Sequence, residues 1–307
     1  MTRGRRLGVA VLVAVTAFAS SWVYRTTASQ PVDDLYATFC AAEAMLSGID
    51  PYGPKCVGQG SFTAYPLTTI LAVAPFTPLG FWWGPLTFWS LLAGLLAWAL
   101  LAQGQVWRLL TLTSMPFVIS FMFLQWAPLI LAVAFLPGLL PLTLTKPHLG
   151  LPVLATHLTR RRAMGCMAFL AVTFAIDPTW PARWLPLTGA FDGFIPALTV
   201  WPAGLVLLAA AVRWRTKEAR FFLLMALMPQ RGLYDLLPLW YLVDTRRQLL
   251  ILNGLSWLML ALVTWASFQG VAMEAIWAST VPLIYVPLLI KVLRRPVPGP
   301  DQALESR

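Results

Sequence analysis

Long apolar runs separated by short polar or basic stretches fill most of this chain. A membrane hydrocarbon core of roughly 30 Å is crossed by about 20 residues of apolar helix. Several runs are too short to cross alone, and broken helices at membrane depth face protein or a wet cavity. We therefore expect an all-α, polytopic transmembrane bundle of roughly nine to twelve segments. We expect helical segments at residues 7–24, 65–79, 82–102, 107–123, 126–144, 147–159, 164–176, 195–212, 221–229, 232–243, 249–268 and 277–292. A tight turn at Gly80 joins the second segment to the third, and residues 125–128, which begin with Gln125, form either a helix join or part of a cavity wall.

Composition agrees with a membrane protein. The chain has 307 residues, of which 59% are hydrophobic and 11% are charged, whereas a soluble domain carries about 25% charged residues. Three arginines before the first apolar run resemble the start of a signal peptide, but the many following spans favour an uncleaved first helix. We treat residues 1–295 as one transmembrane domain and residues 296–307 as a cytoplasmic tail.

The net charge of +10 reflects membrane topology rather than nucleic-acid binding, because the basic residues cluster between apolar runs. With a cytoplasmic N-terminus and alternating sides, sixteen of the 22 Lys and Arg residues fall inside, and eight of the twelve acids fall outside. The two long polar loops, residues 25–64 and 177–194, then face the periplasm or exterior. We expect a multi-pass protein of the bacterial inner membrane.

An amphipathic helix is predicted in the first outer loop, over residues 33–47. Its apolar positions fall on one face at helical spacing, and such a helix would lie in the interface plane. An Asp before it and Gly48 after it are typical helix ends. The apolar positions are Leu35, Phe39, Ala42 and Leu46.

Two adjacent carboxylates, Asp33 and Asp34, open this helix. Asp34 is the candidate general base, since a positioned carboxylate can take the proton of an attacking hydroxyl. The alternative is that it only caps a helix in a solvated loop. Asp33 is the reserve candidate, because either acid could cap the helix while the other points at a substrate.

Cations at the outer ends of broken segments are candidates for binding a lipid phosphate. They are Lys146 and His148, which follow a Pro-rich segment, and Arg231, which precedes Tyr234 and Asp235. The alternatives are that these cations reach lipid headgroups, as we expect for Arg108 and Arg183, or that Arg231 pairs with Asp235 one helical turn away.

The cysteines and histidines give little further evidence about the function. Cys40 and Cys56 share the first outer loop, where an oxidising compartment permits a disulfide, but spacing leaves that pairing open. Cys166 lies in an apolar run. His148 and His157 are the only histidines, so we expect no metal site and no cofactor.

Several motifs occur in the same order as in a known family. The chain resembles the polyprenol-phosphate-mannose-dependent mannosyltransferases of glycosyltransferase family 87. The similar segments are Asp34-Leu35-Tyr36 with residues 41–52, Tyr65-Pro66-Leu67 with residues 75–79, residues 123–129, and Lys146-Pro147-His148 with Arg160-Arg161-Arg162.

The resemblance implies a GT-C fold and an inverting transfer from a lipid-phosphate sugar, without a nucleotide sugar, on the outer face. It implies Asp34 as the catalytic aspartate and Lys146 as a donor-phosphate ligand. Leu124 and Ala127 stand where the family pattern has Gly and Asn, so the resemblance implies no polar role for these two positions.

We therefore predict a cell-envelope glycosyltransferase that moves a hexose, with mannose as first candidate, from a polyprenyl-phosphate donor to a glycolipid or glycan hydroxyl. Asp34 or Asp33 would be catalytic, and Lys146, His148, Arg231 and Tyr234 would bind substrate. The alternatives are a transporter or flippase of a lipid-linked intermediate, and a divergent non-catalytic membrane protein of the same fold.

Overall fold

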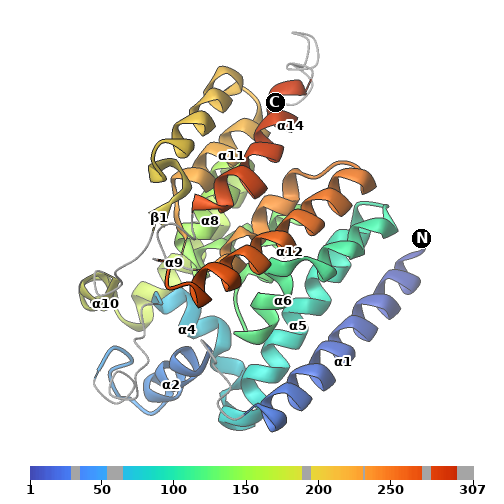
Figure 1. Ribbon diagram of the computed structural model, residues 1–307. Coiled ribbons are helices and arrows are strands. Elements are labelled where there is room, and N and C mark those ends of the chain that lie inside the picture. The colour runs from blue at the N-terminus through green and yellow to red at the C-terminus, as the bar shows by residue number, and fades with distance from the viewer. Residues whose placement is uncertain (29–34, 54–64, 189–194, 231, 272–277, 296–307) are drawn as a thin grey trace.

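The computed structural model describes residues 1–28, 35–53, 65–188, 195–230, 232–271 and 278–295. Most of these residues are helical, and the rest include one short antiparallel strand pair (Figure 1). The elements are α1 (Arg3–Thr27), α2 (Leu35–Leu46), α4 (Leu67–Val73), η1 (Ala74–Leu79), α5 (Gly80–Ala102), η2 (Val106–Thr113), α6 (Met115–Met122), α7 (Ala127–Phe135), η3 (Pro137–Thr145), α8 (Pro147–His157), α9 (Arg160–Ile176), α10 (Trp180–Thr188), β1 (Ile195–Pro196), η4 (Ala197–Thr199), η5 (Ala203–Arg213), α11 (Lys217–Leu227), β2 (Pro229–Gln230), η6 (Leu233–Leu242), α12 (Arg246–Phe268), η7 (Val281–Tyr285) and α14 (Val286–Arg294).

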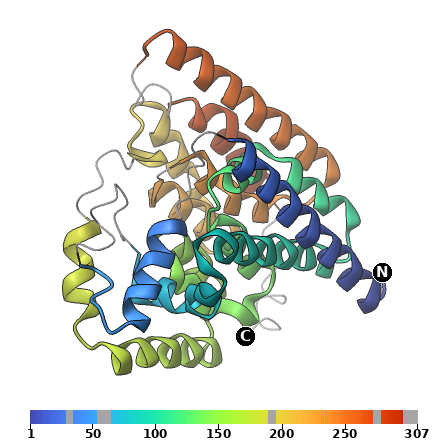
Figure 2. The same ribbon diagram turned by 90° about the horizontal axis from the view of Figure 1, so that it is seen from below.

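Three segments of the described chain are long and apolar enough to cross a membrane: Arg3–Thr27, Leu67–Ala102 and Arg246–Phe268. α1 lies along α5, while α9 and α12 occupy opposite sides of the bundle (Figures 1 and 2). α1, α9 and α12 carry many exposed large apolar side chains, as surfaces facing lipid do. An all-α membrane protein is consistent with these features. The expected nine to twelve spanning segments are more than the described helices of spanning length.

The second long segment turns back on itself at Gly80. This residue has φ +73°, a left-handed conformation that glycine adopts without a steric penalty. The rings of Phe76 and Phe88 lie 5.3 Å apart across the turn. The predicted turn at Gly80 is thereby confirmed, and α5 is the long helix of this pair.

The helix predicted in the first outer loop is present as α2, but its surroundings differ from the prediction. Most of its residues are buried on both sides, whereas Leu46, assigned to the apolar stripe, is 61% exposed. α2 packs against α4, η1 and α5, so other parts of the protein cover it on more than its predicted apolar face. Its small Ala residues permit this close packing, which a count of large apolar residues does not detect. Gly48, with φ +71°, ends the helix as predicted.

The second long polar loop contains helix α10. It follows α9 at a bend of 103°. Asp177 makes the bend, because its Oδ1 accepts hydrogen bonds from the Thr179 amide at 3.0 Å and from the Thr179 hydroxyl at 2.8 Å. This side-chain turn replaces the backbone bonds that a continuing helix would make.

Candidate functional site

A buried polar cluster centres on Lys146, in the interior of the bundle. Its Nζ donates to Asp235 Oδ1 at 2.8 Å and to Gln125 Oε1 at 3.1 Å. The ammonium also lies 4.9 Å from the centre of the Tyr234 ring. Lys146 is 1% exposed and Asp235 is fully buried. Charges in such surroundings persist only when they are paired and hydrogen-bonded, so this ion pair fixes the positions of both side chains.

His148 connects the buried pair to the accessible surface. Its Nε2 lies 3.6 Å from Oδ2 of Asp235, and its side chain remains 24% exposed. Asp235 therefore faces Lys146 with one oxygen and His148 with the other. A ligand approaching from outside would meet the imidazole before it meets the ammonium.

The first turns of several helices surround this cluster. Gln125 lies just before α7, Lys146 is the N-cap residue of α8, and Asp235 lies in the first turn of η6. Amide groups at helix N-termini carry partial positive charge and favour anions. The arrangement therefore concentrates positive potential around one carboxylate.

The chain leading into Lys146 is held by hydroxyl groups from α4. Thr68 Oγ1 donates to the Leu144 carbonyl at 2.7 Å, and Thr69 Oγ1 donates to the Thr145 carbonyl. All of these groups are at least partly buried. Because their positions depend on α4 packing against η3, the location of Lys146 is set by residues far away in sequence.

Gln125 is positioned by an unusual backbone conformation. Leu124, the residue before it, has φ +48°, a left-handed value that is costly for a side chain with a Cβ. The Gln125 carbonyl accepts from Trp89 Nε1 at 3.2 Å. A glycine at position 124 would adopt this conformation without that cost.

Trp126 lies beside the cluster in an aromatic group. Its ring centre is 6.3 Å from that of Tyr65 and 5.0 Å from that of Phe88. The indole Nε1 is buried and has no hydrogen-bond partner among the described residues. Buried donors are rarely left unpaired, so this N–H points to a bound water or ligand.

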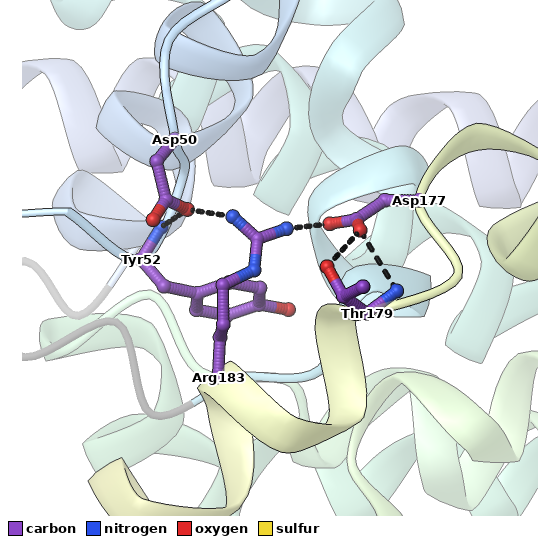
Figure 3. A network of polar contacts seen from close by, with 5 residues as sticks. All are labelled: Asp50, Tyr52, Asp177, Thr179 and Arg183. Carbon is purple, nitrogen blue, oxygen red and sulfur yellow. Dashed lines mark hydrogen bonds and ion pairs between the residues drawn. The ribbon is translucent and has the colours of Figure 1, made fainter.

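A second polar network joins the two outer loops (Figure 3). The guanidinium of Arg183, on α10, lies between Asp50 and Asp177, with Nη1 2.5 Å from Asp50 Oδ1 and Nη2 on Asp177 Oδ2. The ring of Tyr52 lies beneath it at 5.6 Å. Arg183 therefore bridges two loops through two ion pairs that the sequence did not predict.

Tyr52 is buried in this network. Burial raises the pKa of its phenol above the ordinary value, and the neighbouring Arg183 offsets only part of that rise. The phenol therefore stays protonated near neutral pH. Its hydroxyl has no hydrogen-bond partner among the described residues, so a donor is left available next to the charged bridge.

The structure brings together three of the predicted site residues, Lys146, His148 and Tyr234. Asp33, Asp34 and Arg231 lie outside the described residues. Asp235, considered at first only as a local partner of Arg231, pairs with Lys146 from 89 positions away. Gln125, which the sequence placed at a helix join or cavity wall, is a ligand of the Lys146 ammonium.

The structure also bears on the predictions for the cysteines and for Arg108. Cys40 is disulfide-bonded and Cys166 is free. Arg108, expected to reach lipid headgroups, lies over the Trp107 and Phe135 rings and interacts electrostatically with Asp244.

Within the described part of the chain, no three His, Cys, Asp or Glu side chains are grouped as metal ligands would be. The Lys146 cluster instead offers donors: an ammonium, an imidazole and an indole N–H. Comparison with protein-family models, with curated proteins and with solved structures gives no match to this chain.

Proposed function

We propose that this protein is a membrane glycosyltransferase that uses a polyprenyl-phosphate sugar, with mannose as the first candidate, as its donor. One observation carries the proposal. Lys146, His148 and the first turns of three helices converge on a buried centre with a single carboxylate, Asp235, between the ammonium and the imidazole. Helix N-termini and fixed cations together suit a phosphate, which is the leaving group of such a transfer.

In the proposed reaction, the acceptor oxygen bonds to the anomeric carbon as the bond from that carbon to the phosphate oxygen breaks. The electron pair leaves with the polyprenyl phosphate, and Asp34 takes the hydroxyl proton. His148, with its partial exposure, is the first side chain of the cluster that the phosphate meets. Asp235 holds Lys146 in place rather than touching substrate.

The unpartnered polar groups support a ligand-binding role. The Trp126 indole and the Tyr52 hydroxyl are both buried donors without partners in the described structure. Sugar hydroxyls accept hydrogen bonds and pack on aromatic faces, so both groups suit a hexose. The Arg183 bridge holds Tyr52 in position.

The test is transfer by the purified full-length protein, given radiolabelled polyprenyl-phosphate mannose and a glycolipid acceptor. We expect a heavier labelled glycolipid with the wild type and a rate at least about 100-fold lower for D34N, the scale of a lost general base. D33N is the matched control. If D33N fails and D34N works, the base is Asp33; if both retain the wild-type rate, neither acid is the base.

His148 is the sharper probe of phosphate binding, since H148Q leaves the Lys146–Asp235 pair intact. The variant should keep its thermal stability and transfer more slowly. A transporter or flippase, the rival supported by the same buried ion pair, would instead move labelled donor across vesicles without changing it chemically.

A further inference from the structure

A cavity of about 470 Å³ lies at the beginning of α12, beside α14. In Figure 1, α14 lies near the top, far from α2 and α10 in the lower part. The volume falls in the range of small-molecule sites. Its walls come from Val243, Asp244, Gln248, Ile251, Leu252, Pro287, Leu288, Ile290, Lys291, Arg294 and Arg295.

Positive charge is in excess on the polar side of this cavity. Lys291 Nζ lies 2.8 Å from Asp244 Oδ2, and Arg295 Nη2 lies 3.3 Å from the same oxygen. Arg295 also pairs with Glu218 at 2.5 Å. Arg294 is exposed and forms no ion pair with a described residue. Three cations therefore face two carboxylates, and both partners of Asp244 share one oxygen.

The other side of the cavity is apolar and reaches the protein surface. Leu252 and Leu288 are buried, whereas Ile251 is 49% exposed and Ile290 is 44% exposed. Ile251 lies on α12, a helix with many exposed apolar side chains and the length of a membrane span. The cavity is thus cationic at one end and continuous with the lipid-facing surface at the other.

We propose that this cavity binds an anionic phospholipid. Its phosphate would lie against Lys291, Arg294 and Arg295, since arginine and lysine recognise phosphate by charge-assisted hydrogen bonds. Its acyl chains would follow the exposed wall at Ile251 and Ile290. A free anion would gain nothing from that wall, so the lipid is the better occupant. The basic end is the predicted inner side of the membrane, where basic residues attract anionic lipids.

The experiment reconstitutes the full-length protein into phosphatidylcholine nanodiscs with increasing phosphatidylglycerol, and counts retained lipids by native mass spectrometry. The wild type should retain phosphatidylglycerol in preference to phosphatidylcholine. R294Q/R295Q should weaken that retention about 25-fold, at roughly fivefold for each arginine near a membrane surface. R215Q removes an exposed arginine outside the cavity and should change nothing.

A second pair of variants separates a lipid from a soluble anion. The I251S/I290S variant keeps every cation of the cavity. It should retain phosphatidylglycerol more weakly than the wild type, whereas the affinity of the cavity for inorganic phosphate should stay unchanged. If R294Q/R295Q misfolds because Glu218 loses its partner, R294Q alone is used. Equal retention of both lipids, R294Q behaving as R215Q, or inorganic phosphate binding as tightly as the lipid would each overturn the proposal.

Discussion

The ammonium of Lys146 and the carboxylate of Asp235 lie 2.8 Å apart in the interior, although 89 positions separate them in the chain. Removing one partner of a buried ion pair leaves an uncompensated charge and costs about 3–5 kcal/mol, whereas replacing both with apolar groups is often neutral. The pair thus offers a way to separate a structural role from a functional one.

We expect K146M and D235L each to lower the unfolding temperature strongly, and the double variant to recover most of the loss. Thermal unfolding in detergent, followed by tryptophan fluorescence, gives the unfolding temperatures of the wild type, the two single variants and the double variant. If Lys146 holds the donor phosphate, the stable double variant still transfers no sugar. Additive losses of stability in the double variant would show that the two charges are not coupled.

At position 124, substitution by Gly should destabilise the protein less than substitution by Ala, which is the reverse of the usual order. Both substitutions remove a buried side chain, a loss of about 2–5 kcal/mol. Only Gly also relieves the left-handed strain at φ +48°, which costs about 1–2 kcal/mol. L124G should therefore be less stable than the wild type and more stable than L124A by about 1 kcal/mol. L124A melting at or above L124G would refute this reasoning.

Replacing Arg183 by lysine should weaken the bridge between Asp50 and Asp177. A guanidinium presents separate edges to two carboxylates, but an ammonium is a single point charge. Because Arg183 and Asp50 are about one-third or more exposed, the stability loss should stay near 1 kcal/mol. Hydrogen exchange should quicken in residues 50–53 and 177–188 of both R183K and R183Q, but not in α5. The control is R160Q, which removes an exposed arginine elsewhere. If hydrogen exchange in these two segments is unchanged in R183Q, Arg183 does not bridge the loops.

Thiol labelling should distinguish the cysteines. Denatured, unreduced protein should react with a maleimide at Cys166 and not at Cys40, since Cys40 is disulfide-bonded. Reduction before labelling should add Cys40. Peptide mass spectrometry reports both sites, and labelling of Cys40 without reductant would contradict the assignment. The result also bears on topology, because a disulfide persists on the oxidising side of the membrane.

Hydropathy and turn residues were enough to predict much of the helical layout. The runs at residues 7–24 and 147–159 correspond to α1 and α8, and Gly48 and Gly80 end or turn helices as predicted. Local signals suffice there because helix ends and apolar length are encoded by neighbouring residues. The burial of α2 was not predictable in this way, since it depends on how small residues meet other helices.

The site was predictable only in part, for a similar reason. A lysine at the end of an apolar run is seldom buried without a partner, and Asp235 is an acid inside an apolar run. Their types and surroundings indicate a pair, but nothing local relates positions so far apart. The Asp50–Arg183–Asp177 bridge joins two loops that sequence analysis treats separately, so no spacing rule reveals it.

The order of synthesis gives the Lys146–Asp235 pair a further consequence. At roughly 5–20 residues per second, the ribosome makes Asp235 about 4 to 18 seconds after Lys146, given the 89 positions between them. During that interval the ammonium lacks the carboxylate that neutralises it in the folded protein, and burying it unpaired is costly. We therefore expect α8 to reach its final place only after η6 emerges.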